Sequence, residues 1–260
     1  MALLSHHGRV SRAWLVAHGE EPLSPAVVDH VLADLGRRAA GEPLAYLVGR
    51  REFHGLDFEV TRDVLVPRPE TECLVDWALE ELPGPDRATA DPVIVVDLGT
   101  GSGVIATTIG KARAYAQLHA VDVSPAALAV ARRNAQRHGV AITFHTGNWW
   151  RAGGLAALRG RIALVASNPP YIRAGDSHLT ALGHEPALAL LGGDDGLEAI
   201  RTIVAGARDH LAPGGLLLLE HGFDQGEALR DLLQREGYVS VETRRDLAGH
   251  ERCTGARRRR

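Results

Sequence analysis

Asn168, Pro169, Pro170 and Tyr171 form the segment whose residue types are best suited to chemistry. They follow an apolar run, Ile162–Ala166, which is typical of a buried strand in a parallel sheet. Neither proline has an N–H for a sheet ladder, so the strand ends where open α/β sheets bind ligands. The Asn side chain, the proline carbonyls and the aromatic ring suit a planar NH₂ group. The alternative interpretation is a strand-ending turn, which Asn-Pro often marks.

A glycine-rich segment, Asp97-Leu98-Gly99-Thr100-Gly101-Ser102-Gly103, links an expected strand to an expected helix. Such glycines permit a tight turn and a close approach of ligand to backbone, although a simple βα turn would also explain them. The dinucleotide fingerprint GxGxxG would need glycine or alanine where this chain has Val104. Asp97 places a carboxylate near a cationic or amino-bearing ligand. The segment therefore favours the amino acid end of S-adenosylmethionine over a pyrophosphate.

Two further features, later in the sequence, would suit the ribose and the adenine of a nucleoside. The next expected strand ends at Asp122, where an acid can accept hydrogen bonds from ribose hydroxyls. Asp122 could instead cap the helix beginning at Pro125, but Ser124 is the better cap. After the third strand come Trp149 and Trp150; one of them is expected to pack on adenine and the other to lie in the core.

Alternating strand and helix patterns position these motifs. They predict a doubly wound, mostly parallel, seven-stranded sheet with helices on both faces. The expected strands lie at 93–98, 118–123, 142–146, 162–167, 216–220, 239–243 and 252–255, and the expected helices at 104–115, 125–138, 197–210 and 225–236.

The first 82 residues have a different pattern. Residues 9–41 are expected to be helical, with Ser24 as an N-cap, and 50–66 to form a β-hairpin or extended connector. An amphipathic helix is expected over 71–82, and Pro83–Asp86 is expected to be a loop. These patterns predict three parts: a short helical N-terminal domain (1–50), a hairpin or linker (51–70) and a catalytic domain (71–260).

Composition limits the possible partners. The chain has 260 residues, a formal net charge of −3 and a sequence pI of about 6.5, which gives no electrostatic reason to bind a long polyanion. Cys73 and Cys253 fit no metal or redox motif, and the histidines lack metal spacing, so we expect reduced thiols and no metal. No apolar run approaches transmembrane length, so we expect a cytoplasmic protein. Arg257–Arg260 is expected to be a solvated, disordered tail.

From about residue 11 to residue 255 the chain resembles the bacterial release factor glutamine N5-methyltransferases, a family of class I S-adenosylmethionine-dependent enzymes. The resemblance implies that S-adenosylmethionine is the cofactor. It also implies that the substrate is the Gly-Gly-Gln glutamine of class 1 peptide chain release factors. Separately, we expect no stable nucleic acid or membrane partner and a monomeric protein. The segments that carry the resemblance are Gly41–Leu47, Arg51–Leu56, Val66–Glu72, Gly99–Gly103, Asp122, Asn168–Tyr171, Glu185-Pro186, Leu219–Gly222 and Arg252–Gly255.

The resemblance also implies residue roles. Gly99–Gly103 would line the methionine part of the cofactor, Asp122 would hold the ribose and Trp149 would flank the adenine. Asn168 would touch both cofactor and substrate, and Pro169, Pro170 and Tyr171 would complete the glutamine pocket. Three departures are a shorter amino-terminal domain, Asn148, which stands where an acid often precedes the family's tryptophan, and the tail Arg257–Arg260, which is not a feature of the family pattern.

Four alternatives remain at this point. A sister family methylates a glutamine of a large-subunit ribosomal protein, but it tends to have Pro-Arg-Ser-Pro where this chain has Pro67-Arg68-Pro69-Glu70. An N6-adenine or other nucleic-acid amino methyltransferase also acts on a planar amine, and the mildly acidic charge argues against it. A module that binds the cofactor without turnover would not need the groups of Asn168–Tyr171. An NAD-dependent oxidoreductase is disfavoured by Val104.

Overall fold

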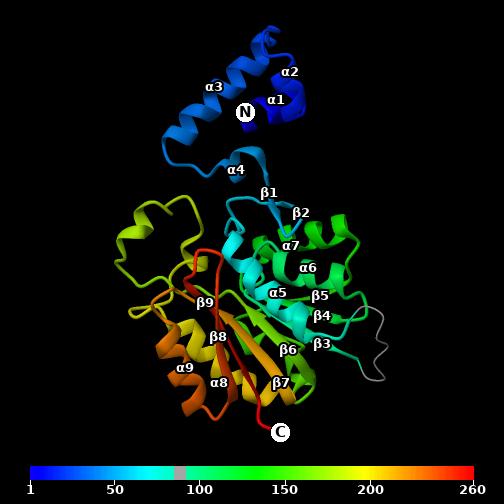
Figure 1. Cartoon of the computed structure of the whole chain (residues 1–260), viewed down its shortest axis with the longest axis vertical. Coiled ribbons are helices and arrows are strands. Elements are labelled where there is room, and N and C mark those ends of the chain that lie inside the picture. The colour runs from blue at the N-terminus through cyan, green and yellow to red at the C-terminus, as the bar shows by residue number, and fades with distance from the viewer. Residues whose placement is uncertain (85–91) are drawn as a thin grey trace.

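The computed structural model describes residues 1–84 and 92–260, and seven strands of this part form one sheet (Figure 1). The strand order is β5-β4-β3-β6-β7-β9-β8. Neighbouring strands from β5 to β7 are parallel, whereas β9 is antiparallel to both β7 and β8. The prediction of a doubly wound, mostly parallel sheet is confirmed. Pro85 and Asp86 of the predicted loop lie outside the described residues.

Most element bounds lie close to the predicted ones, and β5, β6 and α7 match them residue for residue. The strands of the sheet are β3 (Ile94–Leu98), β4 (Gln117–Asp122), β5 (Ile142–Thr146), β6 (Ile162–Ser167), β7 (Leu211–Glu220), β8 (Val239–Arg245) and β9 (Glu251–Arg257). The helices around it are α5 (Glu72–Glu81), α6 (Val104–Ala112), α7 (Pro125–His138), α8 (Glu198–His210) and α9 (Gly226–Arg235). No helix in the described part combines the length and apolar character needed to cross a membrane.

The expectation of a disordered basic tail was wrong for its first two residues. Arg257 is the last residue of β9 and pairs with Leu216, and its guanidinium donates to Glu81. The Arg258 N–H donates to the Gly215 carbonyl at 2.8 Å. Because β9 inserts between β7 and β8, the chain end is ordered by backbone pairing on both sides, a long-range effect that the local charge pattern does not reveal.

The sheet is covered on both faces, and alternate residues of each strand enter different cores. On one face, Val95 and Leu164 pack with apolar residues of α5 and α6. On the other face, Val96 and Val165 pack with apolar residues of α8 and α9. Burial on both sides explains why these strands are continuous apolar runs in the sequence.

The order of the strands creates a switch point beside β3. The chain runs outward from β3 through β4 to β5 and then returns to place β6 on the other side of β3. Connections at the carboxyl ends of β3 and β6 therefore lead in opposite directions and leave a crevice, where such sheets bind ligands. The buried Ser167 hydroxyl donates to the Leu98 carbonyl at 2.6 Å and joins the ends of the two strands.

The N-terminal helices stand apart from the sheet (Figure 1). They are α1 (Ala2–Gly8), α2 (Arg12–Ala17), α3 (Pro25–Ala39) and α4 (Leu44–Val48). Leu3, Val31 and Leu47 form their small core. The predicted helical stretch over 9–41 is broken between α2 and α3, and α1 and α4, which lie outside it, were not predicted. The Ser24 hydroxyl caps α3 as expected, accepting from the Val27 N–H at 3.4 Å.

A β-hairpin connects the helices to the sheet domain, as the sequence predicts. Its strands, β1 (Arg50–Phe53) and β2 (Leu56–Glu59), pair antiparallel. Phe53 and Phe58 are 1% and 0% exposed and join the core beneath α5 and α6. These rings therefore attach the hairpin to the sheet domain.

An ion-pair network ties the N-terminal helices to the chain that follows the hairpin. The Glu42 carboxylate accepts from Arg37 at 2.8 and 2.9 Å and from Arg62 at 2.7 Å. Arg37 also donates to Asp34 at 2.8 Å. Hydrogen bonding from Arg37 is the main cause that lowers the pKa of Glu42 from its usual 4.5 to about 2; burial opposes this shift.

Glu42→Gln should destabilise the protein at neutral pH by on the order of 1–2 kcal/mol, because charge-assisted hydrogen bonds to a buried carboxylate are lost. The folded-state pKa lies below the usual value, so this contribution is present above pH 4.5 and is lost as pH falls toward 2. Urea unfolding at several pH values measures it. The exposed variant Glu20→Gln is the control, and a pH-independent difference for Glu42→Gln would contradict the assignment.

Candidate active site

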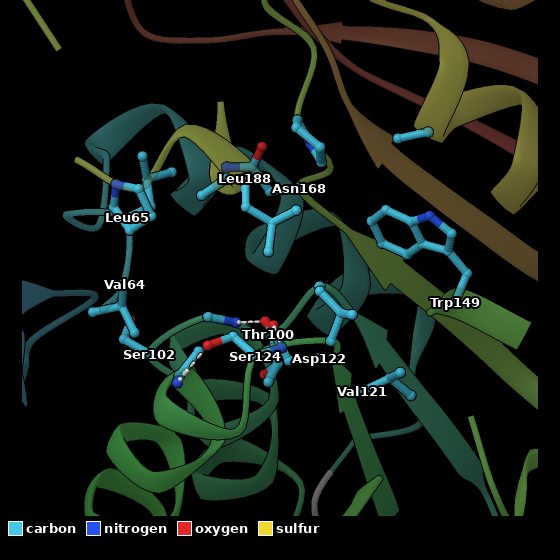
Figure 2. A pocket seen from close by; sticks show the side chains of 18 of the residues that line it. Val64, Leu65, Thr100, Ser102, Val121, Asp122, Ser124, Trp149, Asn168 and Leu188 are labelled. Atoms are coloured by element: carbon cyan, nitrogen blue, oxygen red, sulfur yellow. Dashed lines mark hydrogen bonds between the residues drawn. The ribbon is translucent and has the colours of Figure 1, made fainter. Parts of the chain in front are cut away.

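A cavity of about 590 Å³ lies at the crevice, a volume within the usual range for ligand sites (Figure 2). Its wall contains most of the site residues that the sequence predicts. They lie at or just after the carboxyl ends of four strands. These are Gly99, Thr100, Gly101 and Ser102 after β3, Asp122 at the end of β4, Trp149 after β5, and Asn168 and Pro170 after β6. Asp97, Gly103, Pro169 and Tyr171 are not part of this wall.

The glycine loop presents its backbone to the cavity. Gly101 has φ +54°, and a Cβ added there would meet nothing within 4 Å. Gly103 has φ +82°, and a Cβ there would lie 3.1 Å from Ala131 Cβ on α7. Gly101 therefore leaves open space for a ligand, while Gly103 supports the loop by close packing against a helix.

Asp97 supports the glycine loop through hydrogen bonds. It is 1% exposed, and its Oδ2 accepts from the Thr100 hydroxyl at 2.6 Å and from the Ala106 N–H at 3.2 Å. Its Oδ1 has no hydrogen-bond partner among the described residues, and burial raises its pKa to about 7. Contact between this carboxyl and the cofactor's amino group stays a prediction.

Asp122 is held firmly on the cavity wall. Its two oxygens accept from the Ser124 N–H and the Gly101 N–H, both at 2.9 Å. Burial raises its pKa, and the backbone hydrogen bonds oppose that shift. The Ser124 hydroxyl accepts from the Ala127 N–H and caps α7, so Asp122 is not needed as the cap. Each carboxylate oxygen keeps a lone pair for a ligand hydroxyl.

The two tryptophans have different surroundings. The Trp149 ring lies over the glycine loop, 3.2 Å from where a Cβ of Gly99 would be, and it points into the cavity (Figure 2). Its backbone has φ +48°, a left-handed conformation that costs energy for a bulky residue. Trp150 also borders the cavity, but its Nε1 donates to the Ile203 carbonyl at 2.9 Å and its ring stacks on His210. Trp149 is thus the better candidate for contact with adenine.

Asn168 lies at the carboxyl end of β6 and is oriented by a residue far away in the sequence. Its Nδ2 donates to the Thr71 hydroxyl at 3.1 Å. Thr71, Arg68 and Pro67 also line the cavity. The sequence did not identify Thr71 as a site residue, and its only signal was membership of the Val66–Glu72 motif.

Tyr171 borders a second, smaller cavity of about 170 Å³. This cavity shares Leu65, Arg68, Asn168 and Ala189 with the larger one, so the two adjoin. The Tyr171 hydroxyl lies 3.5 Å from the buried Glu220 carboxylate. An aromatic ring therefore stands beside the carboxamide, as the sequence predicts, but on the wall of the adjoining space.

The outer wall comes from two segments outside the sheet. Leu65 and Leu188 belong to two separate segments of the chain, and both line the cavity (Figure 2). Glu185 joins these segments, because its carboxylate accepts from the Val66 N–H at 3.0 Å and from the Arg68 guanidinium. Glu185 is 7% exposed and has a structural role here.

The residues present fit S-adenosylmethionine. The open backbone at Gly101, the anchored carboxylate of Asp122 and the Trp149 ring match its amino acid, ribose and adenine parts. Two solved structures share the fold: a methyltransferase from Pyrococcus furiosus (TM-score 0.58, 18% identity, 87% of this chain and 96% of that one) and a ribosomal protein L11 methylase from Lactobacillus delbrueckii (0.50, 19%, 74% and 81%). The sheet order and the site define a class I S-adenosylmethionine-dependent methyltransferase.

Sequence comparisons give the family. The model for the methyltransferase small domain matches residues 85–185, and that for the PrmC N-terminal domain matches residues 1–49. The release factor glutamine methyltransferase of Xylella fastidiosa is 48% identical over 98% of this chain and 91% of its own length. That of Bordetella pertussis is 47% identical over 97% and 92%. The chain belongs to the family of release factor glutamine methyltransferases.

Asp122→Asn should weaken S-adenosylmethionine binding about tenfold or more. A carboxamide offers one oxygen where two N–H groups now donate, so its NH₂ would face a backbone donor and the loop would shift. Isothermal titration with the cofactor measures the change. Asp57→Asn, at a half-exposed hairpin residue that does not line the cavity, is the matched control. Equal affinities for the Asp122 variant and the wild type would remove Asp122 from the binding site.

Proposed function

We propose that the protein transfers the methyl group of S-adenosylmethionine to the side-chain amide nitrogen of the glutamine in the Gly-Gly-Gln motif of a peptide chain release factor. The main support is the position of Asn168. Its NH₂ group is occupied by Thr71, which leaves the carboxamide oxygen as an acceptor at the cavity. An amide nitrogen of a substrate needs such acceptors for its two hydrogens. The names of the relatives point to the same substrate.

The chemistry is a direct displacement. The cofactor supplies an electrophilic methyl group on a sulfonium. The glutamine nitrogen forms a bond to that carbon, the carbon–sulfur bond breaks with its electron pair going to sulfur, and the nitrogen releases a proton to solvent. An amide nitrogen is a poor nucleophile, because its lone pair is delocalised into the carbonyl. The protein's contribution is therefore alignment of the nitrogen and stabilisation of the positive charge that develops on it.

Four residues would carry that contribution. The Asn168 side-chain oxygen and the Pro169 carbonyl would accept the two amide N–H groups. Pro170 and Tyr171 would exclude water and orient the amide plane. The smaller cavity beside Tyr171 would receive the glutamine side chain, since it opens onto Asn168 and the cofactor cavity. Arg68 borders both cavities, and its guanidinium is held there by the ion pair with Glu185.

The remaining parts of the proposal concern organisation and partners. We take residues 1–50 as a helical N-terminal domain, 51–70 as a connector and 71–260 as the catalytic domain. We take the protein to act as a monomer on a class 1 release factor. The expected lack of a stable nucleic acid partner agrees with a formal net charge of −3. A translation-factor substrate would place the enzyme in the cytoplasm.

Incubation with isotopically labelled S-adenosylmethionine and a purified release factor tests the function. Mass spectrometry should find the labelled methyl group on the Gly-Gly-Gln glutamine and none on a factor whose glutamine is replaced by alanine. Parallel incubations contain large-subunit ribosomal proteins, DNA and RNA. Transfer to one of these and none to the release factor would refute the proposal in favour of the corresponding alternative.

Asn168→Ala should lower kcat by about 100-fold or more while changing cofactor affinity only a few-fold, because it removes an acceptor used mainly in the reacting complex. Single-turnover transfer and cofactor titration separate the two effects. Near-normal turnover in this variant would exclude Asn168 from the mechanism.

A further inference from the structure

Trp149 holds a strained conformation on the wall of the cofactor cavity. Its φ of +48° is costly for a bulky residue and persists only where surrounding contacts enforce it. In this conformation the indole ring lies 3.2 Å from where a Cβ of Gly99 would be, over the glycine loop. The contacts that hold the Trp149 loop are therefore needed to keep the ring in the cavity.

A histidine closes that loop at its base. The His145 Nδ1, on β5, lies 2.6 Å from the carbonyl of Gly153, eight positions later in the chain. Trp149 is the middle residue of the enclosed segment, and its own carbonyl accepts from the Ala152 N–H at 3.2 Å. Gly154 has φ +94°, and a Cβ there would lie 2.9 Å from the His145 ring. The lack of a side chain at Gly154 therefore lets the ring reach the carbonyl.

A second histidine, His119 on β4, contacts the other nitrogen of the His145 ring. Its Nδ1 lies 2.9 Å from the His145 Nε2, the ring planes differ by 17°, and the ring centroids are 5.2 Å apart. Nitrogens so much closer together than the centroids must lie near the line that joins the two centroids. An N–H or a lone pair points along that line, so the contact is a well-aligned hydrogen bond.

The partners of the two rings determine where the protons lie. A carbonyl can only accept, so the His145 Nδ1 must carry a hydrogen. The neutral His145 ring then has a lone pair at Nε2, and the His119 Nδ1 must donate to it. Burial, and secondly the charge of His145, lowers the pKa of His119, which favours the neutral form of that ring. With both rings neutral, His119 donates to His145 and His145 donates to Gly153.

We propose that His145, oriented by His119, is a positioning residue for Trp149, because its hydrogen bond to Gly153 closes the loop and keeps the indole ring in the cofactor cavity. Without this bond Trp149 would relax toward an ordinary backbone conformation, and the ring would leave its place over the glycine loop. The Nδ1–H is present in the neutral His145 ring and in its cation, so the bond does not depend on the ionisation of His145. Cofactor affinity is the property affected, whichever protein accepts the methyl group.

Variants of His145 test the proposal by isothermal titration with S-adenosylmethionine. His145→Leu should weaken binding about tenfold, because the loop loses its closing hydrogen bond. His145→Asn should restore affinity to within about threefold of the wild type, since its NH₂ group is also attached to Cγ and can donate to the same carbonyl. Equal affinity in His145→Leu and the wild type, or no recovery in His145→Asn, would overturn the proposal.

His138→Leu is the matched control. The His138 Nε2 also lies near a backbone carbonyl, that of Asp57, at 3.0 Å, but neither residue lines the cavity. This variant should bind the cofactor as the wild type does.

A double variant tests whether His145 acts through Trp149. Trp149→Leu should itself weaken binding, because the contact of its ring with the cofactor is lost. Trp149→Leu combined with His145→Leu should bind no more weakly than Trp149→Leu alone, because both changes remove the same contact. Additive losses would overturn the proposal, since His145 would then affect the cofactor by another route.

A further measurement needs only the wild-type protein. In ¹⁵N-labelled protein at about pH 8, where an unperturbed histidine is neutral, NMR of the ring nitrogens should find the proton of both His119 and His145 on Nδ1. The two rings are assigned through the bonds to their own backbone. A neutral His145 with its proton on Nε2 could not donate to Gly153 and would overturn the proposal. This result decides the hydrogen bond even if a leucine variant fails to fold.

Discussion

The pairing of β3 with β6 holds the two halves of the site together, and the buried hydrogen bond from the Ser167 hydroxyl to the Leu98 carbonyl extends it past the last backbone pair, Asp97 with Ala166. That bond connects β6 to β3 one residue before Asn168 and one residue before Gly99. The acceptor for the substrate and the loop for the cofactor therefore start from a common fixed point in the sheet. A displacement reaction needs its nucleophile and methyl carbon in line, and rigid strands provide such alignment better than loops alone.

The buried carboxyl groups differ in how completely they are paired. Both oxygens of Glu42 accept from arginines, and those of Glu185 accept from Arg68 and from the Val66 N–H. Asp97 and Glu220 are also buried, yet each has one oxygen without a partner in the described part of the chain, and burial raises both pKa values to about 7. Incompletely paired buried acids lower stability and are expected where stability is given up for function. Asp97 holds the glycine loop through Thr100, and Glu220 lies against the Tyr171 hydroxyl.

The sequence was informative where local signals agree. The helix α7 was predicted residue for residue, since Ser124 caps it, Pro125 begins it and Gly139 ends it in a left-handed conformation. The end of β6 was equally clear from two prolines. The hydrogen bond between Asn168 and Thr71 was not predictable, because the residues are 97 positions apart and neither pattern refers to the other. For the same reason, the sequence did not predict that Arg257 belongs to β9, because its pairing depends on the order of the strands in the sheet.

The two sides of the site have different origins, and this difference has a consequence for substrate choice. The cofactor side is built from short turns after β3, β4 and β5, which the sheet itself fixes. The proposed substrate side is built in part from the segments that carry Arg68 and Ala189, which lie outside the sheet and are joined by Glu185. A methyltransferase sheet can therefore keep its cofactor while these segments change. Discrimination between a release factor and another glutamine-bearing protein should reside in that outer wall, where Arg68 borders both cavities.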